Sequence, residues 1–281
     1  MKVSEGFNRD LIERLDRLHL RFSRQVGGIS GGVRRSNEKG SSNEFSDFRS
    51  YNDGDSLRYV DWNSYARLGK LFVKLYMEEK RTEVGILIDN SVSMDFYGKG
   101  YTQGIVAASL AYTVVAGGDR AKLYSGEKSF SYSAKGELNR MLDFLDSTEY
   151  KGGFDPFDCV KKLSLNSRGR FIVISDLMYP PQKLEETVKY LVYKKQEPTV
   201  VMLTAKEENT PELSGELTLN DAETDAKVSL EMTEDILSAY REALKQHKSK
   251  IYDICRRFGA ELIDIRAEEN ISSVLNKIFS Y

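Results

Sequence analysis

The sequence has few of the residues that build zinc and redox centres. Its 281 residues include two cysteines and two histidines. Cys159 and Cys255 are far apart and each falls in a helical pattern, and no spacing of cysteine and histidine suits zinc. We therefore expect two buried thiols. His247 lies on the apolar stripe of a predicted helix and His19 beside another, so we expect packed histidines rather than metal ligands.

Long hydrophobic runs are also missing. No uninterrupted apolar stretch approaches the ~20 residues that a membrane-spanning helix needs. The first 18 residues, MKVSEGFNRDLIERLDRL, lack the apolar core of an export signal. The composition, 40% hydrophobic and 30% charged, is that of a globular protein. We expect a cytoplasmic protein with no membrane span.

Several catalytic and binding motifs are absent. Gly69-Lys70-Leu71 and Gly98-Lys99-Gly100 lack the hydroxyl that follows the lysine of a phosphate-binding loop, so they do not indicate nucleotide binding. The sequence has neither a Gly-x-Ser-x-Gly elbow nor a His-Glu-x-x-His helix. The formal net charge of −2 gives no bulk reason to expect nucleic acid as a partner.

The most informative stretch that is present covers residues 83–97, EVGILIDNSVSMDFY. Residues 84–88 carry no charge and predict a strand buried on both faces of a parallel sheet. Asp89, Ser91 and Ser93 follow directly, where an open α/β sheet places its ligands. One interpretation is a site for Mg²⁺ or Mn²⁺, which prefer oxygen ligands. The alternative is that these residues only cap and turn the chain.

A second buried strand ends in the same way. Residues 170–178, RFIVISDLM, place Asp176 after an apolar run. Two strands that end in carboxylates and are separated by helices are what a metal site at the carboxyl edge of a sheet requires. We therefore group Asp176 with Asp89, Ser91 and Ser93 as candidate metal ligands.

The apolar runs together predict an α/β fold with a doubly wound, mainly parallel, Rossmann-like sheet. The expected strands lie near residues 83–89, 120–125, 170–175, 199–204 and 260–265, with helical patterns between them and an antiparallel edge strand at 128–132. Three parts are expected. Residues 1–25 form an amphipathic helix with Phe7, Leu11, Leu15, Leu18 and Phe22 on one stripe, and residues 26–81 form a Gly/Ser-rich connector and a small β-rich subdomain. Residues 82–281 form the main domain, which contains an acidic hairpin insertion at 207–231.

The Asp-x-Ser-x-Ser motif after a buried strand resembles the metal-ion-dependent adhesion site of von Willebrand factor A-type domains. The stretch RSYNDGDSLRYVDWNSYARLGKLFVK, Arg49 to Lys74, followed by Glu78 and Glu79, resembles the signature of the bacterial family called domain of unknown function 58. Residues 207–230 agree with that family too, so the resemblance runs from about Gly40 to the C-terminus.

This resemblance implies a von Willebrand factor A-like sheet whose loops hold a divalent cation that a partner's carboxylate completes. Asp89, Ser91 and Ser93 match the first loop and Asp176 matches the third. The second loop departs from the pattern, because Phe154 in the run 152–155, Gly-Gly-Phe-Asp, stands where relatives have threonine. Asp155 and Thr148 are possible substitutes. Since Mg²⁺ demands near-octahedral oxygen ligation, we expect weak or absent binding of Mg²⁺ or Mn²⁺.

The family resemblance also implies a function. It implies a non-enzymatic protein-binding module, and the partner class it implies is a MoxR-type AAA+ ATPase, with which family members are thought to form chaperone-like or metal-insertion assemblies. The alternative is a metal-dependent phosphohydrolase in which Asp89 attacks phosphorus. Haloacid-dehalogenase-like phosphatases have an acid two residues after their nucleophile, and this sequence has Ser91 there.

The signature segment contains neighbouring charges around the only tryptophan. We interpret them as an internal ion-pair network around a buried Trp62, with a recognition surface as the alternative. The residues concerned are Arg49, Asp53, Gly54, Asp55, Arg58, Asp61, Trp62 and Arg67.

Overall fold

The computed structural model describes residues 2–26, 45–76, 82–165, 168–211, 215–220 and 227–279. The chain forms two compact units: Met1–Phe22 with Thr82–Tyr281, here the main unit, and Ser23–Arg81, here the small unit. Most of the predicted connector, residues 27–44, lies outside the described residues, as do Glu78 and Glu79 and the side chains of Leu18, His19 and Phe22.

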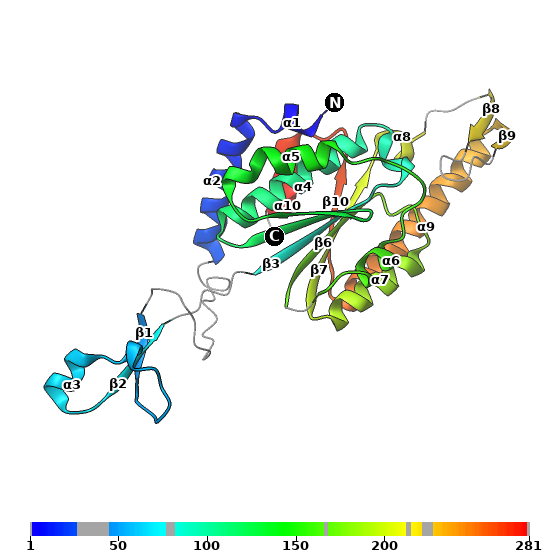
Figure 1. Cartoon of the computed structure of the whole chain (residues 1–281). Helices are drawn as coiled ribbons and strands as arrows, with labels where there is room; N and C mark the ends of the chain where they lie inside the picture. Colours follow the sequence, from blue (N-terminus) through cyan, green and yellow to red (C-terminus); the bar gives the residue numbers. More distant parts are fainter. Residues whose placement is uncertain are drawn as a thin grey trace. The chain divides into compact units, whose positions relative to one another are not determined.

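A six-stranded sheet forms the centre of the main unit (Figure 1). Its order is β10-β7-β6-β3-β4-β5, and every neighbouring pair is parallel except β4 with β5. The strands are β3 (Glu83–Ile88), β4 (Arg120–Ser125), β5 (Lys128–Tyr132), β6 (Gly169–Ser175), β7 (Gln196–Thr204) and β10 (Glu261–Arg266). The predicted α/β fold with a mainly parallel sheet and an antiparallel edge strand is confirmed.

Helices cover both faces of this sheet (Figure 1). One face carries α1 (Val3–Gly6), α2 (Arg9–Val26), α4 (Lys99–Ala116), α5 (Leu138–Asp146) and α10 (Ile271–Phe279). The other carries α6 (Pro156–Lys161), α7 (Pro181–Tyr193) and α9 (Glu234–Phe258). Short helical turns are η2 (Val92–Asp95), η3 (Lys135–Glu137) and α8 (Lys206–Asn209). No helix among the described residues has both the length and the apolar character to cross a membrane.

The N-terminal segment contributes to the core of the main unit. Phe7, Leu11 and Leu15 are buried in the same cluster as residues of α4 and α5. The single predicted helix is broken at Asn8, whose side chain accepts a hydrogen bond of 3.0 Å from the backbone of Leu11. An asparagine in this position satisfies a free N–H at a helix start, which explains the break.

The insertion forms a hairpin of its own. β8 (Gly215–Asn220) and β9 (Lys227–Met232) pair antiparallel in a separate two-stranded sheet, and α8 precedes them.

The two cysteines, Cys159 and Cys255, are free thiols. Cys255 is buried and Cys159 partly buried, and burial raises the pKa of each thiol to about 11, as expected of unreactive thiols.

The small unit pairs β1 (Phe45–Ser50) antiparallel with β2 (Phe72–Tyr76), with η1 (Leu57–Tyr59) and α3 (Trp62–Leu68) between them. Asp61 begins α3 by accepting hydrogen bonds from the backbone of Asn63 and the hydroxyl of Ser64. Arg49 donates two hydrogen bonds of 2.7 Å to the carboxylate of Asp55, so one ion pair of the predicted network is present.

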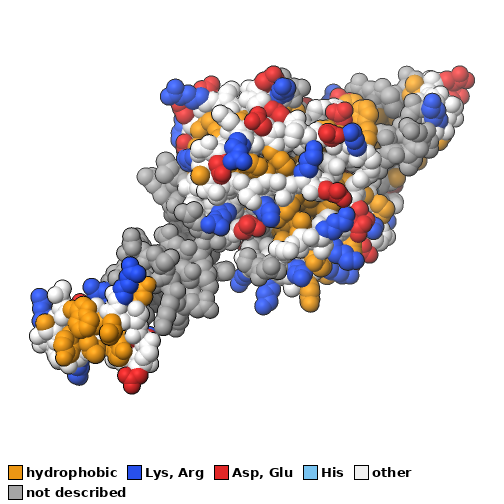
Figure 2. Space-filling model, viewed as in Figure 1, with side chains coloured by type: hydrophobic (Ala, Val, Ile, Leu, Met, Phe, Trp, Pro, Cys, Tyr) orange, Lys and Arg blue, Asp and Glu red, His pale blue; other side chains and the backbone are white. Residues whose placement is uncertain are grey.

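The prediction that Trp62 is a buried anchor is wrong. Its side chain is 55% exposed and meets Tyr65 edge-on, with 6.3 Å between ring centroids. Asp53, Arg58 and Arg67 are exposed as well, so no network of described residues encloses the indole. Figure 2 shows hydrophobic side chains gathered on one face of this unit. The exposed ones are Phe48, Leu57, Tyr59, Trp62, Tyr65 and Leu68. Exposure of this kind favours the recognition surface over the internal network.

Trp62→Ala should therefore cost under about 1 kcal/mol of unfolding free energy, as exposed substitutions usually do. Acrylamide should quench the fluorescence of the wild-type protein almost as fast as that of free indole, since Trp62 is the only tryptophan. Slow quenching, or a cost of several kcal/mol, would contradict this and return the ring to a buried position.

Candidate functional site

The candidate site lies at the point in the sheet where the order of successive strands reverses. β4, the next strand of the chain after β3, pairs with one edge of β3. β6 pairs with the other edge of β3, and the strand after it, β7, pairs with the far edge of β6. The carboxyl ends of β3 and β6 thus flank a topological switch point, where α/β sheets leave a crevice for ligands. Asp89 follows the end of β3, and Asp176 follows the end of β6.

Asp89 is buried at this switch point, and both of its carboxylate oxygens accept hydrogen bonds. Its side chain is 1% exposed. Oδ1 accepts hydrogen bonds from the backbone N–H of Ser91 at 2.8 Å and from its hydroxyl at 2.6 Å. Oδ2 accepts one of 2.5 Å from the hydroxyl of Ser175. Ser175 is not among the residues predicted from the sequence, although its place directly before Asp176 was a usable signal.

The two serines link the two carboxylates. The hydroxyls of Ser91 and Ser93 lie 2.9 Å apart, and Ser93 donates to Oδ2 of Asp176 at 2.9 Å. The structure therefore brings all four candidate ligands, Asp89, Ser91, Ser93 and Asp176, into one cluster of close polar contacts.

The loop after β6 is held in an unusual backbone conformation. Leu177 has a φ of 59°, in the left-handed region that residues with a Cβ rarely adopt. Its N–H donates to Ser175 Oγ at 3.0 Å, and its carbonyl lies 2.7 Å from Nε2 of His247 on α9. His247 is thus a packed histidine that supports the Asp176 loop from a neighbouring helix. Strain of this kind is often found at functional sites.

A buried cation completes the cluster. Lys99, the first residue of α4, is 1% exposed, and its ammonium lies 2.8 Å from Asp176 Oδ2. The same ammonium contacts the carboxylate of Glu208 on α8. The sequence predicts no role for Lys99, since Gly98-Lys99-Gly100 does not match a phosphate-binding loop. Nothing local in the sequence indicates a pairing with carboxylates 77 and 109 positions away.

Burial and charge shift the pKa values of two of these groups. Burial, and then the charge of Asp176, raise the pKa of Asp89 to about 6, against the opposing effect of its serine hydrogen bonds. Burial lowers the pKa of Lys99, but Asp176 and Glu208 together outweigh it, so the net effect is a raised pKa and a charged ammonium. The cluster thus combines three carboxyl groups with one ammonium.

The donor set fits a hard divalent cation in its chemistry. Carboxylate and hydroxyl oxygens are ligands that Mg²⁺ and Mn²⁺ accept. In the part of the chain that the structure describes, no group of three or more His, Cys, Asp or Glu side chains is placed to hold a metal ion. The hydroxyls of Ser91 and Ser93 would therefore be needed beside Asp89 and Asp176.

The second loop lies beside the first, but its side chains are used elsewhere. Val92 N–H donates to the carbonyl of Gly152 at 3.1 Å. Phe154 is buried, with its ring 6.0 Å from that of Tyr179. Asp155 begins α6 by accepting from two backbone N–H groups, and it pairs with Lys183 at 2.8 Å. An aspartate directly before Pro156 is a helix-start signal that favours this capping role.

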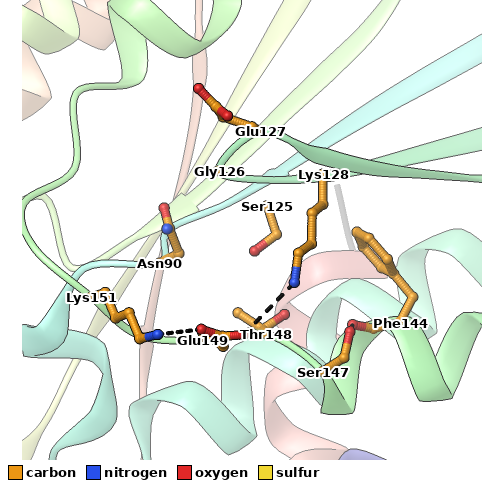
Figure 3. A pocket seen from close by; sticks show the side chains of 10 residues that line it. All are labelled: Asn90, Ser125, Gly126, Glu127, Lys128, Phe144, Ser147, Thr148, Glu149 and Lys151. Atoms are coloured by element: carbon orange, nitrogen blue, oxygen red, sulfur yellow. Dashed lines mark hydrogen bonds and ion pairs between the residues drawn. The ribbon is translucent and has the colours of Figure 1, made fainter.

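Thr148, the other candidate for the second loop, lines a different hollow (Figure 3). Asn90 and Ser125 also line this cavity, which has a volume of about 200 Å³. At its edge, Lys128 and Lys151 form ion pairs with Glu149. The hydroxyl of Thr148 is buried and makes no hydrogen bond within the described residues. A role for Asp155 or Thr148 at the cation stays a prediction.

Fold and site together define an α/β protein with an oxygen-rich cluster at the switch point of a doubly wound sheet. The chain belongs to the family described as "Protein of unknown function DUF58", whose model matches residues 47–250. No curated protein matches it.

Three solved structures are similar to this chain at low identity. Conserved hypothetical protein BatB from Bacteroides thetaiotaomicron is 14% identical, with a TM-score of 0.42 over 71% of this chain and 98% of that one. An aerotolerance-related membrane protein from Bacteroides fragilis NCTC 9343 is 13% identical, with a TM-score of 0.41 over 71% and 96%. The pilus adhesin SpaC from Lactobacillus rhamnosus GG is 11% identical, with a TM-score of 0.39 over 72% and 30%.

Proposed function

We propose that this chain is a non-enzymatic protein-binding module that acts with a MoxR-type AAA+ ATPase in the maturation of protein complexes. The observation that carries the proposal is the cluster at the switch point, in which Ser91 donates to Asp89, Ser93 donates to Asp176, and the two hydroxyls lie 2.9 Å apart. Two carboxyl groups buried beside each other repel and cost stability, which supports a role beyond folding. Resemblance to the family supplies the class of partner.

A divalent cation is part of this proposal. Asp89, Ser91, Ser93 and Asp176 would hold Mg²⁺ or Mn²⁺ weakly, as a degenerate metal-ion-dependent adhesion site. A carboxylate of the partner would complete the ligand shell, so the cation and the partner would each strengthen the binding of the other.

Exposed apolar side chains beside both loops support protein binding. Phe96 and Tyr97 directly follow the turn that carries Ser93, and both are exposed. Met178, two residues after Asp176, is exposed too. Aromatic residues and methionine are enriched in protein interfaces, so these three would surround the cation with contact surface.

A phosphohydrolase that uses Asp89 is the alternative from another class. Both carboxylate oxygens of Asp89 already accept hydrogen bonds, and the side chain is buried, which is unfavourable for attack on phosphorus. Turnover of a generic aryl phosphate with Mg²⁺, abolished by Asp89→Asn, would overturn the binding proposal.

An affinity pull-down with the full chain as bait and purified MoxR-type ATPase as prey tests the proposal. Asp89→Ala/Ser91→Ala should lower capture by about tenfold or more, because it removes two ligands that hold the cation. Asp158→Ala/Ser147→Ala, which removes a carboxylate and a hydroxyl from exposed positions of the same unit, should bind like wild type.

A third bait locates the contact. Trp62→Ala/Tyr65→Ala alters the exposed face of the small unit and leaves the cluster unchanged. Loss of capture by this variant, with full capture by Asp89→Ala/Ser91→Ala, would assign the partner to the small unit and contradict the proposed site.

A further inference from the structure

Lys99 is the most unusual charged residue of the main unit. A lysine is almost never fully buried unless its charge is compensated. Here the ammonium lies between Asp176, which is 3% exposed, and Glu208, whose side chain is 17% exposed. Breaking a buried pair of this kind is costly, so the lysine needs at least one of the two carboxylates at all times.

The ammonium uses the oxygen that a metal ion would need. Asp176 Oδ2 accepts from Ser93 at 2.9 Å and from Lys99 at 2.8 Å, whereas Oδ1 accepts from the backbone of Met178 at 3.1 Å. Oδ2 is therefore the Asp176 oxygen on the side of the serines. A cation held by the serines and Asp176 would compete with Lys99 for the same atom.

Glu208 offers Lys99 a second, well-supported partner. Its Oε2 accepts a hydrogen bond of 2.9 Å from the backbone of Ala205, and its carbonyl accepts one of 2.7 Å from the hydroxyl of Tyr240 on α9. The carboxylate is thus fixed in place whether or not Asp176 is available. The flexible four-carbon stem of a lysine allows its ammonium to shift between two such neighbours.

We propose that Lys99 is a built-in competitor of the divalent cation: it neutralises Asp176 when no metal is bound and is held by Glu208 when a metal takes Asp176. This inference rests on the proposed function, because it describes regulation of the same cation site. The exchange makes cation affinity depend on two residues that are not ligands. Lys99 lowers that affinity, and Glu208 restores part of it by retaining the displaced ammonium.

Calorimetric titration of the full chain with Mn²⁺ tests the exchange in four proteins: wild type, Lys99→Met, Glu208→Gln and the double variant. Lys99→Met should bind Mn²⁺ about tenfold more tightly or better, since the competitor is gone. Glu208→Gln should bind about threefold to tenfold more weakly, since the displaced ammonium loses its anchor.

The double variant separates this exchange from a simple effect of charge. If Glu208 acts only through Lys99, the double variant should bind Mn²⁺ as Lys99→Met does. Additive effects, which would bring the double variant back near wild type, would overturn the exchange. Lys189→Met is the control, because it removes a positive charge of the same unit that pairs with Glu185 instead; it should leave the affinity unchanged.

Three other outcomes of these titrations would also contradict the proposal. Wild-type binding that Asp89→Asn abolishes, with no gain in Lys99→Met, would overturn the competition while leaving the proposed cation site intact. No saturable Mn²⁺ binding by any of the proteins would overturn the cation site and the competition together. Should Lys99→Met fail to fold, Glu208→Gln still decides, because affinity equal to or above wild type would refute the anchor.

Discussion

Phe171→Ala should cost the main unit about 3–5 kcal/mol of its free energy of unfolding, the usual range for removal of a fully buried phenylalanine. Phe171 is fully buried on β6, in the middle of the sheet. Its ring stacks on that of Tyr124 with 6.0 Å between centroids. Denaturation followed by far-UV circular dichroism measures the loss; fluorescence of Trp62 would report on the small unit instead.

The same ring explains a glycine in the central strand. A Cβ added to Gly85 would lie 2.4 Å from the ring of Phe171, closer than such atoms approach. Gly85→Ala should therefore destabilise the protein, and far less so in the Phe171→Ala background, where the space is free. Phe96→Ala is the control, because that ring is exposed and should contribute little. Equal penalties for Gly85→Ala in both backgrounds would show that the ring is not what requires the glycine.

The sheet was predictable because its signal is local. A buried parallel strand is an apolar run with both faces covered, and residues 84–88 and 171–175 have that pattern before any contact is known. The meeting of Asp89 and Asp176 follows from the same rule, since carboxyl ends of neighbouring parallel strands share one edge.

The details that sequence analysis missed depend on long-range packing. Lys99 looks like a surface lysine until the fold brings Asp176 and Glu208 to it. Trp62 looks like an anchor because tryptophan is usually buried, but in the small unit this residue is 55% exposed. Phe154 occupies core space, which its place in the sequence does not reveal. Phe154→Thr would supply the hydroxyl that the second loop lacks, and we expect it to raise cation affinity at a cost in stability.

The buried ion pair leads to the second large effect on stability. Asp176→Asn keeps the shape of the side chain but removes its charge, and it should cost about 3 kcal/mol of unfolding free energy because a buried ammonium loses one of its two carboxylates. The measurement is the same denaturation followed by circular dichroism, without divalent cations.

Glu185→Gln provides a control with matched geometry. Lys189 and Glu185 approach each other to 2.8 Å, the same distance as Lys99 and Asp176, but their side chains are 54% and 26% exposed rather than 1% and 3%. Water already solvates the surface pair, so its loss should change stability little, and added salt should weaken it further. The buried pair should keep its contribution in high salt. Similar small losses for both variants would show that Lys99 finds enough compensation in Glu208 alone, and that Asp176 is free to bind a cation at no cost to the fold.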